Sequence, residues 1–317
     1  MVRIELSCVR IEPVTARSVK PTVRLKSMRG LTMHSPFSTR RLLPTQALRL
    51  VAAVSLATLS ACGGGGGSGD NGGGGSGGLS NNACAAAGLN AKIIDGTECD
   101  DTRSPIVKIN LFASNGSRFL CSGTVVQARS VLTAGHCFLS ESNETIEGAS
   151  VIVDGQERFA SVVYLHPEYR VGDTAIFNDV AVLEFAQPLN LPPLPVILSR
   201  KVVADDTFAI LGYGSDERGE FGVLRSGEMA ASSVSPNHIF SVFGSSGSNT
   251  CNGDSGGPAL LTFTDDSGQE ITGIVGVTST GTAGLDCQTG DLSLFANVQE
   301  EPIVSFLRRR APGLTFR

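Results

Sequence analysis

The 317-residue chain has only four histidines and no tryptophan. The histidines are isolated from one another along the chain, and disulfide bonds explain the cysteines better than the closely spaced ligand pairs of a zinc site. We therefore expect no metal and no other cofactor. Any chemistry must come from ordinary side chains, and a mechanism that needs an imidazole has few candidates.

The sequence also lacks an apolar run long enough to cross a bilayer comfortably. The longest such stretch near the start, residues 50–59, is short and follows Arg40, Arg41 and Arg49. This arrangement is typical of the apolar core of an export signal rather than of a membrane-spanning helix. We assign residues 1–61 to this signal, with Met28 or Met33 as possible true start sites.

The signal ends in residues 59–62, LSAC, which resemble the lipobox of bacterial lipoproteins. The resemblance implies that Cys62 is acylated, becomes the mature N-terminus and attaches the protein to a membrane. The expected location is then the bacterial cell envelope, as an outer-membrane lipoprotein. Ordinary cleavage near Ala61, which would give a secreted product, is the alternative.

Residues 62–83 form a second, different region, because residues 63–78 are almost entirely glycine. Such a composition cannot bury enough apolar surface to offset its backbone entropy, so we expect a flexible tether. Beyond it, residues 93–317 hold 14 Lys and Arg against 27 Asp and Glu, a formal charge of −13. A surface this acidic repels nucleic acid, which we exclude as a partner.

The region after the tether consists of short β-rich runs separated by Gly, Asn and Asp. We predict strands over residues 106–112, 123–127, 150–153, 159–165, 180–185, 208–212 and 271–278, and one helix over residues 300–310. Many short strands without intervening helices favour an all-β fold of antiparallel barrels or a sandwich over a parallel α/β sheet.

One stretch, residues 251–258 (CNGDSGGP), has the composition of a nucleophile loop. The backbone N–H groups of Gly253 and Ser255 can both point at the atom that the Ser255 hydroxyl attacks. A serine needs a base and a carboxylate. The candidates are His136, in residues 132–137 (LTAGHC), and Asp179, at the start of an apolar strand.

Three motifs, TAGHC at 133–137, NDVA at 178–181 and GDSGGP at 253–258, resemble the signatures of trypsin-like serine proteases. The resemblance covers residues 93 to about 310. It implies two six-stranded antiparallel β-barrels with a C-terminal helix, and a triad of His136, Asp179 and Ser255 in the cleft between them. The implied activity is that of a serine endopeptidase acting on proteins or peptides, which we expect to be a monomer.

The same family is made as inactive precursors. Residues 92–96 (KIIDG) resemble the family's activation sequence. An activating protease would cut after Lys92, remove residues 84–92 as a propeptide and free the amino group of Ile93 to pair with Asp254. A buried carboxylate without a cation is costly, so the active site should form only after cleavage.

Six cysteines follow Cys62, and this even number suggests disulfides in an oxidising compartment. The resemblance pairs Cys121 with Cys137, beside the histidine, and Cys251 with Cys287, beside the substrate pocket. We then pair Cys84, just before the cleavage site, with Cys99. That bond would keep the cleaved domain attached to the tether.

Substrate preference depends on four further positions implied by the resemblance. Asn249 stands at the pocket floor, where an aspartate would select Arg or Lys, so we expect an uncharged P1 residue. Ser279 supports Asp179 and begins the strand on which substrate pairs, Gly281 leaves the pocket entrance open, and Ser293 narrows the pocket. Tyr213 replaces the family's usual tryptophan.

Two other hydrolase folds also use such a serine. Residues 253–257 fit the G-x-S-x-G pattern of α/β-hydrolases, but those place histidine after serine, and no histidine follows Ser255. The subtilisin order requires aspartate before histidine. A rival of another class is a catalytically silent binding protein built on the protease fold.

Overall fold

A computed structural model describes residues 84–87, 97–99, 101–139, 145–244, 248–282 and 287–317. Near the N-terminus it adds only the backbone of β1 (Ile4–Glu5), β2 (Val9–Ile11) and β3 (Arg24–Leu25), which pair with β18, β6 and β9. The chain divides into Met1–Met28 with Ser80–Arg317, and Arg29–Leu79. Cys62, Lys92 and Ile93 lie outside the described residues.

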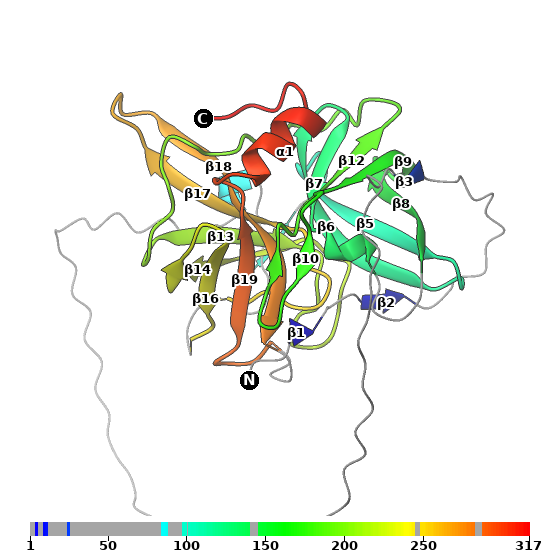
Figure 1. Ribbon diagram of the computed structural model, residues 1–317, viewed down its shortest axis with the longest axis horizontal. Helices are drawn as coiled ribbons and strands as arrows, with labels where there is room; N and C mark the ends of the chain where they lie inside the picture. Colours follow the sequence, from blue (N-terminus) through cyan, green and yellow to red (C-terminus); the bar gives the residue numbers. More distant parts are fainter. Residues whose placement is uncertain are drawn as a thin grey trace, which may run out of the picture. The chain divides into compact units, whose positions relative to one another are not determined.

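The first half of the domain is a closed six-stranded barrel (Figure 1). Its strand order is β12-β7-β6-β5-β8-β9, and β12 pairs with β9 to close it. The six strands are β5 (Ile106–Ala113), β6 (Arg118–Gln127), β7 (Ser130–Thr133), β8 (Ile146–Val153), β9 (Gln156–Leu165) and β12 (Ala181–Phe185).

Local sequence explains one turn and one close contact of this barrel. Asp154 and Gly155 both have positive φ, at 50° and 70°, and they make the two-residue turn that joins β8 to β9, as Asp-Gly turns commonly do. Gly123 is needed where the wall is tight, since a Cβ there would lie 2.7 Å from side-chain atoms of Ile109 and Val131.

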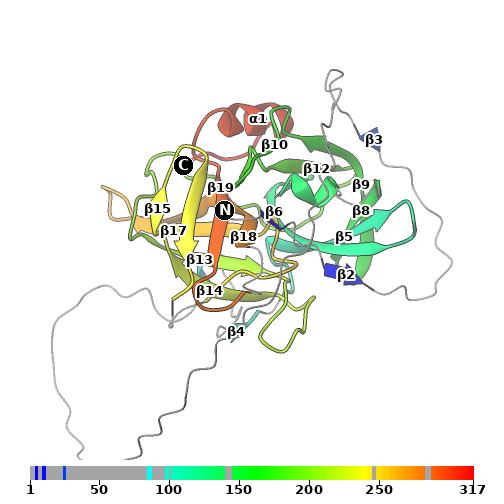
Figure 2. The same cartoon turned by 60° about the horizontal axis from the view of Figure 1, so that its bottom comes forward.

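The second half is a curled half-barrel whose strand order is β15-β16-β19-β18-β17-β13-β14-β4 (Figure 2). Its strands are β4 (Thr97–Glu98), β13 (Thr207–Gly212), β14 (Arg225–Ala230), β15 (Ser233–Val234), β16 (His238–Val242), β17 (Pro258–Thr264), β18 (Glu270–Thr282) and β19 (Leu292–Asn297). Phe208 and Phe295 pack edge to face in its core.

The remaining elements are short. A small hairpin joins β10 (Arg170–Val171) to β11 (Ile176–Phe177), and two 3-10 turns cover Ala85–Ala87 (η1) and His136–Phe138 (η2). The helix α1 spans Ile303–Arg310 and buries Ile303, Phe306 and Leu307 against the main core. No helix among the described residues is long and apolar enough to span a membrane.

This architecture confirms the all-β fold class of paired antiparallel barrels with a C-terminal helix, with the second sheet curled into a half-barrel. A backbone hydrogen bond joins the two halves directly, because the N–H of Ser122 in β6 donates to the carbonyl of Ser255 at 2.8 Å. Residues from both halves therefore meet where β6 lies next to Ser255.

Candidate active site

Three side chains from separate parts of the chain meet where the two sheets join. His136 begins η2 after β7, Asp179 precedes β12, and Ser255 lies in the loop between β16 and β17. The Nε2 atom of His136 lies 2.9 Å from Ser255 Oγ, and its Nδ1 lies 2.7 Å from Asp179 Oδ2. The predicted triad residues are thus connected by hydrogen bonds.

Asp179 is fixed by several donors. Its Oδ1 accepts the backbone N–H of His136 at 2.8 Å, and its Oδ2 accepts the hydroxyl of Ser279 at 2.5 Å. Burial alone raises the pKa of Asp179, but the nearby imidazole and these hydrogen bonds outweigh it and lower that pKa below its usual value. The carboxylate is therefore ionised and holds the His136 ring in one orientation.

The loop before Ser255 contains a glycine in a left-handed backbone conformation. Gly253 has φ +100°, which side-chain-bearing residues rarely adopt. Its carbonyl accepts a hydrogen bond from the Ser122 hydroxyl at 2.9 Å, while the same Oγ accepts the N–H of Tyr213 at 2.9 Å. Sequence reasoning missed Ser122, because it is 131 positions from Gly253.

Asp254 is buried in a tightly fitted site. It accepts the N–H groups of Gly214 and Cys251 at 2.8 and 2.9 Å. A Cβ on Gly214 would lie 2.5 Å from the carboxylate, so glycine is required there. Burial raises the pKa of Asp254 to about 6, although these donors and the charge of Arg225 oppose the rise.

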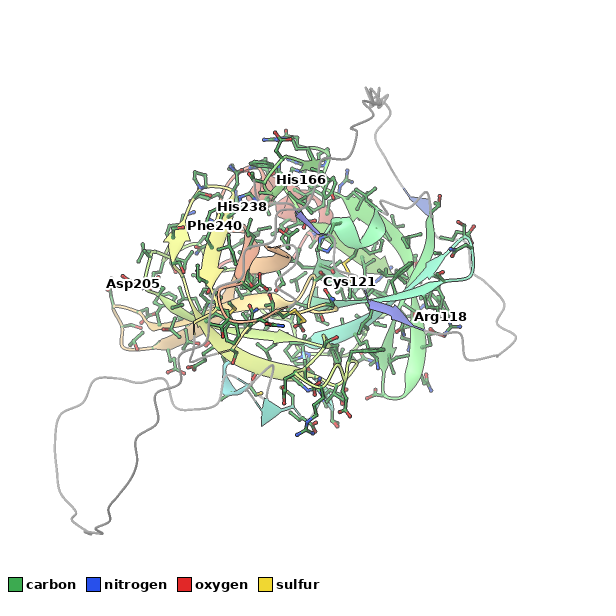
Figure 3. The ribbon with its side chains drawn as sticks, turned by 90° about the horizontal axis from the view of Figure 1, so that it is seen from below. Arg118, Cys121, His166, Asp205, His238 and Phe240 are labelled. Atoms are coloured by element: carbon green, nitrogen blue, oxygen red, sulfur yellow. A yellow bond between two sulfur atoms is a disulfide. The ribbon has the colours of Figure 1, made fainter. Side chains whose placement is uncertain are left out.

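Two predicted disulfides are present, Cys121–Cys137 and Cys251–Cys287. The first lies beside His136, and Cys121 is labelled near the middle of Figure 3. The predicted Cys84–Cys99 bond is not formed in this structure. The two sulfurs nevertheless lie 2.9 Å apart, and Cys84 Sγ is also 2.8 Å from Ser226 Oγ.

Two of the four predicted pocket residues, Asn249 and Ser293, belong to one buried polar network, whereas the Ser279 hydroxyl bonds to Asp179. Asn249 Oδ1 accepts the Ser293 hydroxyl at 2.8 Å, and the hydroxyls of Thr250 and Ser293 are 2.8 Å apart. Gly281 follows Ser279 by two positions on β18. Sequence reasoning missed Asp291, which joins this network because Asn249 Nδ2 donates to Asp291 Oδ2 at 3.2 Å.

The other two described histidines take no part in this site. The Nε2 of His238 lies 2.7 Å from the carbonyl oxygen of Ile176, and His166 packs against Phe306 of α1 (Figure 3). Burial lowers the pKa of both rings. They are packing residues, which leaves His136 as the base of the site.

The fold and this arrangement are those of the trypsin-like family, which has the chymotrypsin fold. The trypsin family profile matches residues 93–302, and the chain belongs to this family. Mast cell protease 3 of Ovis aries is 35% identical over 110 residues, covering 33% of this chain and 42% of that protein. Putative trypsin-6 of Homo sapiens is 25% identical over 190 residues, covering 53% and 74%.

Serine protease 1 of Drosophila melanogaster is 26% identical over 230 residues, covering 66% of this chain and 83% of the relative. For the first two relatives, mast cell protease 3 and duodenase-1 of Bos taurus, the matched region spans less than half of their length. The family profile match includes His136, Asp179 and Ser255.

Proposed function

We propose that the protein is a serine endopeptidase that hydrolyses peptide bonds through an acyl-enzyme. The observation that carries this proposal is the hydrogen-bonded series from Asp179 through His136 to Ser255. With a proton on Nδ1 facing the carboxylate, Nε2 presents its lone pair to the serine hydroxyl. The inert hydroxyl thereby gains the base that it needs.

The chemistry then follows two half-reactions. Ser255 Oγ bonds to the peptide carbonyl carbon while His136 takes its proton, and His136 returns that proton to the departing amine as the C–N bond breaks. Water next attacks the ester carbonyl and loses a proton to His136, which returns that proton to Ser255 Oγ as the Oγ–acyl bond breaks and the acid product leaves. Asp179 stabilises the imidazolium in both steps.

The backbone N–H groups of Gly253 and Ser255 would bind the oxyanion that forms in each half-reaction. Donors of this kind each contribute about 10²- to 10³-fold in rate. The hydrogen bond from the Ser122 hydroxyl to the Gly253 carbonyl supports this role, because it holds the Gly253–Asp254 peptide, which lies between the two proposed donors in the chain.

We propose further that the chain is a precursor activated by a protease that cuts after Lys92. The support is the environment of Asp254, a fully enclosed carboxylate whose pKa burial raises to about 6. The new ammonium of Ile93 would enter this site and restore the favourable ionised form.

Cys84 and Cys99 would keep the cut propeptide attached. Their sulfurs are already close, and a disulfide forms when both thiols lose a proton and together give two electrons to an oxidising protein disulfide, which becomes a dithiol. With Cys62 acylated, the activated domain would stay on the bacterial envelope; without acylation it would be secreted. We base both proposed locations on the sequence of residues 50–62.

A fluorophosphonate probe tests the function directly, since it labels only an activated serine. The cleaved wild-type protein should be labelled and a Ser255→Ala variant should not. Ser233→Ala, which alters an exposed serine on β15, is the matched control and should label normally. A correctly cleaved but unlabelled wild-type protein would favour the catalytically silent binding protein instead.

A further inference from the structure

A cavity of about 270 Å³ lies where the end of α1 meets the closed barrel. Three arginines line it, and the other polar side chains in its wall include an amide, a phenol and a carboxylate: Arg129, Arg309, Arg310, Gln127, Tyr164 and Glu184. We propose that this cavity binds a phosphate group, in a site separate from the triad.

The cavity gathers positive charge on a domain that is otherwise acidic. Residues 93–317 carry a formal charge of −13, whereas three arginines and one glutamate give the lining of this cavity a formal charge of +2. None of the three arginines forms an ion pair with a residue that the structure describes. Their charge is therefore available to an anion that enters.

Two of these arginines are already held in place. Arg129 donates through Nε to the carbonyl of Phe185 at 2.8 Å, which leaves both of its terminal NH₂ groups for a ligand. The guanidinium carbon of Arg310 lies 4.7 Å from the centre of the Tyr164 ring, a contact that uses none of its N–H donors. The Tyr164 hydroxyl donates to Glu184 Oε2 at 3.0 Å, which fixes the ring and occupies one oxygen of the opposing carboxylate.

These donors suit phosphate better than carboxylate. One guanidinium group can pair with both oxygens of a carboxylate, whereas a phosphate ester presents three acceptor oxygens and can pair with two arginines at once. The size agrees, because the volume is just below the range of about 300 to 1,000 Å³ that is common for small-molecule pockets. The cavity therefore fits one phosphate group with a small substituent.

The cavity lies at the far end of β7 and β12 from the triad. Ser130 of β7 and Glu184 of β12 pair in register, and both line the cavity. Thr133, at the other end of β7, comes three residues before His136. Since a strand rises about 3.3 Å per residue, Ser130 and Thr133 are about 10 Å apart. A bound phosphate group would therefore not compete with a peptide at Ser255.

The phosphate can belong to a soluble ester or to a phospholipid head group, and two probes distinguish these sources. Calorimetry with glycerol 1-phosphate tests the soluble ester. Co-sedimentation with phosphatidylglycerol vesicles, compared with phosphatidylcholine vesicles, tests the head group. Both use the full-length chain with Ser255→Ala, to prevent self-cleavage, and Cys62→Ser, to exclude an attached acyl chain.

Arginine variants show whether binding occurs in this cavity. Arg129→Gln and Arg310→Gln should each weaken binding at least about 10-fold, because each removes a charge-assisted hydrogen bond. Arg308→Gln is the matched control and should bind like the parent protein. Arg308 also lies in the last turn of α1, but it is placed over the ring of Phe316 and does not line the cavity.

Thermal unfolding establishes which variants are folded, and Arg129 and Arg310 lie on different elements, so either folded variant is sufficient. Binding of glycerol 1-phosphate that depends on these arginines supports a soluble source, and the same dependence with phosphatidylglycerol vesicles alone supports the head group. Binding of neither probe overturns the proposal. Equal binding by Arg308→Gln and a folded Arg129→Gln or Arg310→Gln variant does so as well. Neither result bears on the protease function, which is tested at Ser255.

Discussion

The imidazole of His136 lies 2.9 Å from the hydroxyl of Ser255, although 119 positions separate the two residues. One comes from the closed barrel and the other from the loop that precedes β17 in the second sheet. Any change that shifts the sheets relative to one another should therefore reduce activity without removing a reacting group.

Asp179→Asn should lower kcat by about 10³- to 10⁴-fold. The amide NH₂ cannot accept the Nδ1 proton, so the ring would favour the tautomer that carries its proton on Nε2 and could not deprotonate Ser255. Asp205→Asn is a suitable control, because Asp205 is exposed and has a positive φ that asparagine tolerates. Kinetics on one peptide substrate measure both variants, and similar losses in both would contradict the assigned role.

Uncleaved protein should lose stability as pH rises from about 4 to about 6, specifically because of Asp254. The pKa of Asp254 is about 6 in the folded state, against an ordinary value of 3.8. The unfolded chain therefore loses this proton at a lower pH than the folded state does, and ionising Asp254 in the folded state lowers the free energy of unfolding. Each pKa unit corresponds to about 1.4 kcal/mol, which makes the cost on the order of 3 kcal/mol above pH 6.

Denaturant unfolding of the Ser255→Ala precursor, with and without Asp254→Asn, measures this effect. The difference between the two free energies of unfolding should change with pH in that window. His166 and His238, whose lowered pKa values act in the opposite direction, are present in both proteins and cancel. Parallel curves would show that Asp254 is not the responsible group.

Lys92→Gln should leave the chain uncleaved and inactive. Without the Ile93 ammonium, Asp254 has no new cation, and the loop through Gly253 should not reach its active arrangement. Activity is compared after exposure to the activating protease, with cleavage followed by mass spectrometry. Full activity in a protein shown to remain uncut would refute the precursor mechanism.

Cys84 and Cys99 should form a disulfide under oxidising conditions. After cleavage at Lys92, non-reducing gels should show one species and reducing gels two fragments. Cys84→Ser should release the N-terminal piece without reductant, whereas Ser226→Ala, which removes the hydroxyl neighbour of Cys84, should not. Release from the oxidised wild type would remove the proposed attachment.

Sequence patterns predicted those parts of the structure that are determined by residues close together in the sequence. The motifs around His136 and Ser255 identified the residues that meet, and short β-rich runs located β5 and β12. β14 was missed because RSGEMA has little intrinsic strand preference; six pairs with β13 hold it in place.

Contacts between distant residues could not be read in this way. Ser122 and Asp291 sit in unremarkable sequence, and each acts on a partner far along the chain, Gly253 and Asn249. The helix also begins at Ile303 rather than residue 300, directly after Pro302. Tertiary packing determined these features.

The most direct test of the central claim is fluorophosphonate labelling of the cleaved protein followed by peptide mapping. The account predicts one labelled residue, Ser255, with labelling abolished in His136→Ala, which lacks the base, and retained in Ser233→Ala. An unlabelled Ser255 in protein with a verified Ile93 terminus and both triad-side disulfides intact would contradict it.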